Sequence, residues 1–263
     1  MRTPSIAIIT DSTCDLPPDV CFAAGIRVVP VAVTNDGAGS RTTQPSPEAF
    51  LSVLEEAVRD HDGAVVITHS AKLGGTIASA RAAAERVSTG FPIAVIDSGS
   101  VTMGLGFAVL RAAEVAQGGG GLDEVVAAVD ETRASTEVVF FVETLEYLEA
   151  GGRIGRAAAL IGGALQLKPM LRIDEGQIVP FERARTRTRA IDDLAQFVTG
   201  LGKIERVAVL HASSPEEATV LANRLRQETG LKGDRVMVTQ IGPAVAAHIG
   251  PGAMGVAVVD LPG

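Results

Sequence analysis

The residues best suited to chemistry are Gly74 and Gly75, followed by Thr76 at the predicted start of a helix. Free N–H groups in the first turn of a helix, together with the positive end of its dipole, favour a carboxylate or a phosphate. Glycine also lets a head group approach the backbone closely. The pattern indicates an anion site, although an ordinary tight turn between a strand and a helix explains the same residues.

Small polar residues follow three predicted strands in the first half of the chain. These runs are Thr10–Thr13, Thr68–Ser70 and Asp97–Ser100. If the strands are parallel, polar side chains such as Ser70 and Ser98 line one edge of a sheet. Ligands of open α/β sheets bind beyond the carboxyl ends of the strands. We therefore expect the ligand of this half of the chain at that edge.

Two arginine patterns also stand out. Arg153 lies between two glycine-containing turns, where it suits either a functional role or a bond to the carbonyl groups at a helix end. Four further arginines alternate at the end of a predicted strand: Arg183, Arg185, Arg187 and Arg189. This basic cluster is interpreted either as a solvated face or as a docking site for an acidic partner or a phosphate.

The sequence contains no signature of a known catalytic site. A P-loop, a GxGxxG loop after the first strand, an HExxH helix and a GxSxG elbow are all missing. His69 and His211 have no nucleophile at a recognised spacing, and we expect both to be buried and hydrogen-bonded, whereas His61 is expected to be solvated. Cys14 and Cys21 are too few and wrongly spaced for a disulfide framework or a zinc site. We expect no metal and no cofactor.

The composition narrows the class of partner. Hydrophobic residues make up 46% of the 263 positions, which is ample for a buried core, while aromatic residues make up only 3%. Few aromatic rings and a net charge of −8 argue against nucleic acid and against anionic membranes as partners. No apolar run is long enough to span a membrane, and the first residues lead straight into a strand without a signal peptide. We expect a cytoplasmic protein without stable membrane insertion.

The elements that position these residues alternate between strands and helices. Short, almost wholly apolar runs at 5–10, 64–68 and 93–96 are typical of a parallel sheet covered on both faces. Another strand is predicted at 26–34, followed by a polar loop at 35–47. Ser46 is expected to cap the helix that begins at Pro47. The first half of the chain is therefore predicted to be an α/β domain.

The stretch from Glu143 to Ala190 is predicted to fold as two helices and a β-hairpin. The second helix, 154–167, carries mostly alanine and glycine, so it leaves room for an apolar ligand. The hairpin is expected to turn at 174–177. Farther along, Ser214-Pro-Glu-Glu217 has the pattern of a helix capping box.

With these residues in hand, the chain resembles the DegV family of bacterial fatty-acid-binding proteins over nearly its whole length. The motifs that carry the resemblance are ITDSTCDLP (9–17), TTQPS (42–46), SAKLGGT (70–76), VIDSGSVTMGLG (95–106), LEYLEAGGRIGRAAALIGGALQLKPML (145–171) and IGPAVAAHIGPGAMG (241–255). The resemblance implies an N-terminal three-layer α/β/α domain with a parallel sheet, at about 1–145. It also implies a C-terminal α/β domain with a mixed sheet, at 146–263.

The same resemblance implies that a long-chain fatty acid such as palmitate lies in a buried tunnel between or within the domains. Thr42, with Thr43 beside it, matches the loop whose threonine holds the carboxylate in the family. A family serine that also holds the carboxylate falls on Gly74, so this chain lacks that hydroxyl. Backbone N–H groups of Gly74 and Gly75, or an ordered water, are the expected substitutes.

The resemblance further implies a carrier rather than an enzyme. In the family, the loaded protein presents its fatty acid to a separate ATP-dependent fatty acid kinase, which makes an acyl phosphate. Arg153 and His248 match positions near the head group, where both can donate to phosphate oxygens. Arg183 and Arg185 are then the candidates for kinase docking.

Two other classes of function stay open. A dihydroxyacetone-kinase-like domain shares the general architecture and uses a histidine to trap a small carbonyl compound. A regulatory interaction module would bind no small ligand. A large apolar pocket favours the lipid carrier, a small polar pocket favours the second class, and a solid core favours the third.

Overall fold

A computed structural model of the chain describes residues 5–35, 40–87, 90–161 and 167–261. The chain divides into two compact units of similar size. The first comprises residues 1–34 and 42–134, and the second comprises residues 35–41 and 135–263.

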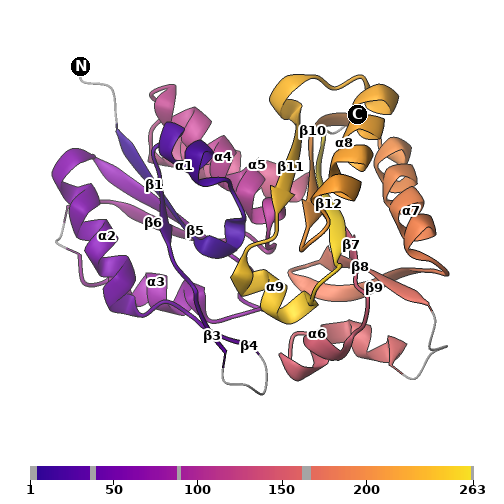
Figure 1. Ribbon diagram of the computed structural model, residues 1–263. Coiled ribbons are helices and arrows are strands. Elements are labelled where there is room, and N and C mark those ends of the chain that lie inside the picture. Colours follow the sequence, from indigo (N-terminus) through magenta and orange to yellow (C-terminus); the bar gives the residue numbers. More distant parts are fainter. Residues whose placement is uncertain (1–4, 36–39, 88–89, 162–166, 262–263) are drawn as a thin grey trace. The chain divides into compact units, whose positions relative to one another are not determined.

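The first unit is built on a four-stranded sheet of order β2-β1-β5-β6 (Figure 1). Its strands are β1 (Ile6–Asp11), β2 (Ile26–Val29), β5 (Gly63–Thr68) and β6 (Ile93–Asp97). All three strand pairings are parallel. Every residue of β1 and β5 is buried, as the unbroken apolar runs predicted.

Helices cover both faces of this sheet. They are α1 (Pro18–Ala23), α2 (Pro47–Asp60), α3 (Thr76–Ala84), α4 (Met103–Gln117) and α5 (Leu122–Ala134). One core joins α2 and α3 to the sheet, with Phe50 and Leu54 packed on alternate residues of β1 and β5. Helix α4 contacts the same two strands and α5 contacts β5, and both helices lie on the opposite face (Figure 1). The predicted three-layer α/β/α arrangement is confirmed.

The second unit contains a six-stranded mixed sheet of order β11-β10-β12-β7-β8-β9. Its strands are β7 (Thr136–Phe141), β8 (Lys168–Asp174), β9 (Gln177–Ala184), β10 (Lys203–His211), β11 (Val236–Gln240) and β12 (Met254–Leu261). Among the pairings of these described strands, only that of β10 with β11 is parallel. The mixed sheet is as predicted.

Four α-helices and two short 3-10 helices complete the described part of this unit. They are α6 (Glu146–Ala150), α7 (Arg187–Gly200), α8 (Pro215–Thr229), α9 (Pro243–Ile249), η2 (Gly155–Leu160) and η3 (Gly233–Arg235). Helices α7 and α8 pack Leu194 and Leu221 into a core with Val209 and Val256 of the sheet. Among the described helices, none has the length and apolar character needed to cross a bilayer.

The division between the units falls earlier than the expected boundary near 145. That boundary would include β7 in the first domain, but β7 pairs with β12 and β8 in the second sheet. The structure therefore divides after Ala134. The apolar sequence of β7 suits a central strand of either sheet, so the sequence could not assign it to one of them.

The predicted strand at 26–34 is interrupted. It forms β2, which ends at Val29, and a separate strand β3 (Ala32–Asn35). Pro30 has no N–H group for a sheet, and the N–H of Val31 donates to Ser12 Oγ at 2.9 Å. The predicted loop at 35–47 likewise contains a strand, β4 (Ser40–Thr43), which pairs with β3 in a two-stranded sheet.

The predicted helix at 154–167 is wrong as a continuous element. The 3-10 helix η2 occupies Gly155–Leu160, and Ile161 is extended, with ψ of 138°. Residues 162–166 of the prediction lie outside the described part of the chain. Gly155 has a positive φ and lies against β9, where an added Cβ would be 2.8 Å from the carbonyl oxygen of Ile178. Close packing on the hairpin, rather than helix propensity, determines this segment.

Candidate functional site

The three polar strand ends of the first unit meet at one edge of its sheet. Strands β1, β5 and β6 run in parallel and end at Asp11, Thr68 and Asp97. The segments beyond them are bonded to one another: the N–H of Ser98 donates to the carbonyl of Thr68 at 3.0 Å, and the N–H of Ser70 donates to the carbonyl of Ser100 at 2.8 Å. The structure therefore brings together the polar runs that the sequence placed at one edge.

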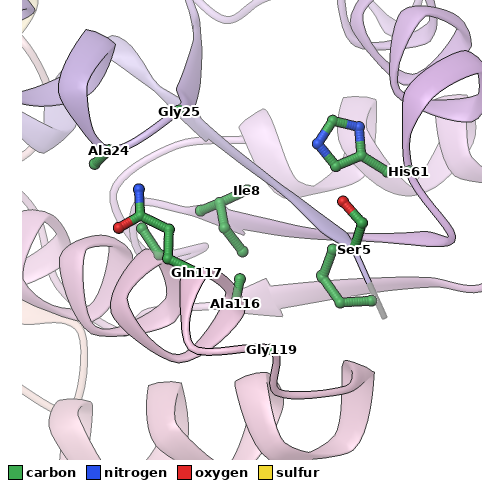
Figure 2. Close-up of a pocket in the computed structure, with 10 residues that line it drawn as sticks. Ser5, Ile8, Ala24, Gly25, His61, Ala116, Gln117 and Gly119 are labelled. Atoms are coloured by element: carbon green, nitrogen blue, oxygen red, sulfur yellow. The ribbon is translucent and has the colours of Figure 1, made fainter. Parts of the chain in front are cut away.

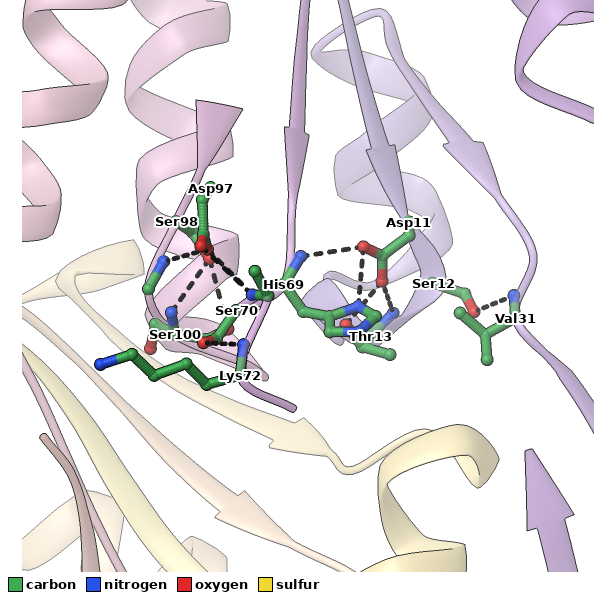
Figure 3. A network of polar contacts seen from close by, with 12 residues as sticks. Asp11, Ser12, Thr13, Val31, His69, Ser70, Lys72, Asp97, Ser98 and Ser100 are labelled. Carbon is green, nitrogen blue, oxygen red and sulfur yellow. Dashed lines mark hydrogen bonds and ion pairs between the residues drawn. The ribbon is translucent and has the colours of Figure 1, made fainter. Parts of the chain in front are cut away.

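Asp11 is the centre of a buried network at this edge (Figure 3). Its Oδ1 accepts from the N–H of Thr13 at 3.0 Å and from Thr13 Oγ1 at 2.6 Å. Its Oδ2 lies 2.9 Å from the N–H of His69 and 3.0 Å from His69 Nδ1. Burial raises the pKa of Asp11, but the bonds from His69 and Thr13 outweigh that effect and hold the pKa below its usual value. The carboxylate is therefore ionised at neutral pH.

As the sequence predicts, His69 is buried and hydrogen-bonded, with 7% of the residue exposed. Its partner Asp11 could not be identified from spacing, because 58 residues separate the two. The pair could have been predicted from the positions of the two residues. The aspartate ends one parallel strand, and the histidine follows the neighbouring strand.

The Gly74–Gly75 turn lies directly beside this network. A Cβ on Gly74 would be only 2.6 Å from His69 Nε2, so the imidazole occupies the space of a side chain at position 74. A Cβ on Gly75 would collide with the side-chain amide of Gln44. Gly75 is the N-cap residue of α3, and it has no side chain that could accept hydrogen bonds from the N–H groups of the first turn.

Thr42 and Thr43 end strand β4, and the next residue ties them to the same helix. Gln44 Nε2 donates to Ser79 Oγ of α3 at 3.0 Å. The side chain of Gln44 thereby packs on Gly75. Thr42 is half-buried and Thr43 is exposed. The structure thus holds the expected threonine loop beside the expected glycine turn.

Ser70 and Ser98, the two expected serines, are buried and bonded within their own turns. Ser70 Oγ accepts from the N–H of Lys72 at 3.2 Å. Ser98 Oγ accepts from the N–H of Ser100 at 3.1 Å and donates to its carbonyl at 3.3 Å. These bonds shape the polar edge (Figure 3). A carboxylate would have to compete with the carbonyl of Ser100 for the hydroxyl proton of Ser98.

Arg153 and His248 come together around one glycine in the second unit. Arg153 Nη1 donates to the carbonyl of Gly151 at 2.5 Å, which matches the bond to a helix-end carbonyl that the sequence left open. The imidazole of His248, in α9, covers the same glycine and leaves no room for a Cβ there. Helices α6 and α9 contact each other, and both side chains lie against Gly151, which follows α6.

The basic cluster at 183–189 is divided between a strand and a helix. Arg183 lies in β9 and Arg185 follows it, and both are exposed. Arg187 lies in the first turn of α7 instead, and it is half-buried. Its guanidinium donates to Glu143 at 2.7 Å, to Glu217 at 2.7 Å and to Ser214 Oγ at 2.9 Å. The prediction that these arginines alternate along the end of a single strand is therefore wrong for the part of the cluster that lies in α7.

This guanidinium also overturns the predicted capping box at 214–217. Ser214 makes no side-chain bond to the helix, because its hydroxyl and the carboxylate of Glu217 both bind Arg187. The carboxylate of Glu143 accepts from this arginine and also from Lys168, whose Nζ lies 2.6 Å from Glu143 Oε2. Burial raises the pKa of Glu143, but these two cations outweigh it and lower the pKa. This network ties β8, α7 and α8 together through residues that sequence spacing does not relate.

A separate cavity of about 410 Å³ lies in the first unit (Figure 2). Its lining includes Ser5, Ile6 and His61, at the amino ends of β1 and β5, and therefore at the opposite edge of the sheet from Asp11. None of the expected ligand residues lines it. Within the described residues, no group of three or more His, Cys, Asp or Glu side chains could hold a metal ion.

Comparisons with known proteins agree with the architecture. A family profile described as an uncharacterised protein of the DegV family matches residues 35–261. A DegV domain-containing protein of Streptomyces coelicolor is 38% identical, covering 96% of this chain and 98% of its own. One from Deinococcus radiodurans is 36% identical, with coverages of 98% and 99%.

Solved structures of similar proteins include ones described by the ligand that they bind. A DegV family protein from Thermus thermophilus, described by its fatty acid binding, is 33% identical with a TM-score of 0.89 and coverages of 98% and 100%. DegV of Bacillus subtilis, described as a fatty acid binding protein, is 28% identical with a TM-score of 0.84 and the same coverages. Similarity to these proteins therefore extends over the full length of both units.

Proposed function

This chain belongs to the DegV family, and we propose that it binds one long-chain fatty acid, such as palmitate, in a buried apolar tunnel. The observation that carries the proposal is its similarity, over 98% of its length, to a Thermus protein described by its fatty acid binding. The second part of the proposal is that the chain acts as a carrier. It presents the carboxylate of the bound lipid to a separate ATP-dependent fatty acid kinase. This step takes place in the cytoplasm, where ATP is available to the kinase.

The energetics assign different roles to the two ends of the ligand. Burying about 14 methylene groups at ~0.8 kcal/mol each gives on the order of 10 kcal/mol before ordering costs. A charge-assisted bond to the head group adds about 1.5–3 kcal/mol. The tail therefore supplies most of the affinity, while the polar residues determine which end of the lipid is presented.

We assign the head group to Thr42, with Thr43 beside it, and to the N–H groups that follow Gly74 in the Gly74–Gly75 turn, because the N–H of Gly74 itself donates to the carbonyl of Ser70 at 3.2 Å. The support is the bond from Gln44 to α3, which holds the threonine loop beside the turn. Free N–H groups at the start of α3 favour a carboxylate. Ser70 and Ser98 remain candidates as residues that shape this edge.

We assign the transfer step to Arg153 and His248, which converge on Gly151. Phosphorylation of a carboxylate develops negative charge, and donors of this kind stabilise it. Arg183 and Arg185 are assigned to kinase docking, because both are exposed. Arg187 is excluded from that role, since its donors are bonded to Glu143, Glu217 and Ser214.

Mass spectrometry of an organic extract from the purified protein tests the proposal. We expect about one long-chain fatty acid per chain after expression in a bacterial host. Delipidated protein should take up added palmitate and then support acyl-phosphate formation by a fatty acid kinase. An extract without lipid, combined with no uptake of added fatty acid, would refute the carrier function and leave the small-carbonyl domain and the regulatory module as alternatives.

A further inference from the structure

We propose that His69 Nε2 binds the ligand carboxylate in place of the missing hydroxyl at position 74, and that the imidazole takes up one proton when the carboxylate binds. The inference rests on the proposed fatty acid function and names one of the groups that performs it. Its starting point is the distance of 2.6 Å between Nε2 and the place that a Cβ on Gly74 would occupy.

The hydrogen bonds of Asp11 determine which imidazole nitrogen carries a proton. Its two oxygens accept from Thr13 N, Thr13 Oγ1 and His69 N. Since the carboxylate is ionised, it can only accept, so the fourth contact requires a proton on His69 Nδ1. A neutral imidazole then has a bare lone pair at Nε2.

Nε2 faces the start of α3 and has no hydrogen-bond partner among the described residues. The side chain is more than nine-tenths buried, and Nε2 is not among its fully enclosed atoms, so a ligand or a water can reach this nitrogen. The adjacent turn presents the first N–H groups of a nine-residue helix. The two features converge on the same place, and both suit an anion once Nε2 carries a proton.

A carboxylate at this place would put the imidazole between two anionic groups. Asp11 holds Nδ1–H, and the ligand needs a donor at Nε2, so both nitrogens must be protonated. Other charged groups near this edge act elsewhere: Asp97 of β6 accepts from the N–H groups of Ala71 and Gly99, and Lys72 is exposed on the turn. Asp15 follows the 3-10 helix after β1. Binding should therefore draw one proton from solvent wherever the free imidazole is neutral.

Isothermal titration of the delipidated full chain with myristate, below its aggregation concentration, measures this proton. The enthalpy at pH 8 is compared in phosphate and Tris buffers, whose ionisation enthalpies differ. We expect proton uptake on lipid binding, and an affinity that falls as the pH rises. Tetradecanol, which has no carboxylate, should bind without proton uptake.

Variants identify the group that takes up the proton. His69→Gln should bind myristate with no proton uptake and with little pH dependence. His61→Gln, a histidine at the opposite edge of the same sheet, is the matched control and should behave as the wild type. The double variant His69→Leu with Gly74→Ser replaces the imidazole by the usual hydroxyl and should bind independently of pH. Circular dichroism checks the folding of each variant.

The outcomes separate the two proposals. Tight binding of myristate by the wild type without proton uptake would overturn the role of His69 and leave the lipid carrier intact. Proton uptake that persists in His69→Gln would also overturn it, because another group would then be titrating. No binding of any fatty acid by the wild type would refute the carrier function, and this inference with it.

Discussion

Asp11 offers a direct test of how the ligand edge is built, because four donors converge on one buried carboxylate. In Asp11→Ala, the backbone N–H groups of Thr13 and His69 lose their acceptor. A buried unsatisfied donor costs about 1–3 kcal/mol, so the loss should be about 2–6 kcal/mol. In Asp11→Asn, the amide oxygen can serve one of the two N–H groups while the NH2 faces the other, and the expected cost is about 1–3 kcal/mol.

Amide hydrogen exchange by NMR measures this effect locally, which matters in a chain of two units that need not unfold together. The opening free energies at Thr13 and His69 should fall in the order wild type, Asn, Ala. Asp97→Asn is the matched control: Asp97 is half-buried and water can replace its bond to the N–H of Gly99, so about 1 kcal/mol or less is expected. Equal protection in the wild type and Asp11→Ala would refute the reasoning.

The pH dependence of the same measurement follows from the pKa of Asp11. Burial raises that pKa, but the bonds from His69 and Thr13 lower it by more. A lowered pKa in the folded state stabilises the fold above the ordinary aspartate range near 3.9, and the stabilisation is lost as pH falls through the folded value. The difference between the wild type and Asp11→Asn should therefore be full at pH 7 and shrink below about pH 4.

The remaining predictions concern the ligand and its transfer. Thr42→Val should weaken fatty acid binding by about 1–3 kcal/mol in a titration, because it removes a hydroxyl and keeps the shape; unchanged affinity would assign the carboxylate to other groups. Arg153→Ala and His248→Ala should still co-purify with lipid, while acyl-phosphate formation falls at least about tenfold, or ~1.4 kcal/mol in the barrier; lost lipid with undiminished turnover would contradict this. Arg183→Glu with Arg185→Glu should weaken kinase association in a salt-dependent way while lipid binding persists, and salt-independent association would argue against docking there.

The sequence correctly predicted elements whose structure depends on interactions between residues close together in the chain. Ser46 caps α2 with Pro47 behind it, as expected, and its Oγ accepts from the N–H of Ala49 at 3.3 Å. The hairpin turns where predicted, with Asp174 paired to Gln177. Positive φ angles at Glu175 and Gly176 complete that turn. In each case the residues that matter are fewer than five positions apart.

Contacts between residues that are distant in the chain explain most of the structural features that the sequence did not predict. Arg187 reaches Glu143, 44 residues away, and Glu217, 30 residues away, and so removes a capping box that spacing alone supports. The segment at 154–167 has the composition of a helix, but Gly155 packs on the backbone of Ile178. The outcome in both places depends on what the fold brings near.

Position 74 shows why a ligand site is harder to predict than a strand. From the sequence, a glycine in place of the usual serine indicates a lost ligand group. In the structure the space for that side chain is already taken by His69, whose orientation is fixed by Asp11. The glycine is therefore required by the imidazole, and positions 69 and 74 act as one unit: a serine added beside His69 would have to displace the ring. A hydroxyl donates at any pH, whereas an imidazole held by a carboxylate donates from Nε2 only when protonated. If His69 binds the carboxylate as proposed, the exchange preserves a head-group donor and makes its strength depend on proton concentration.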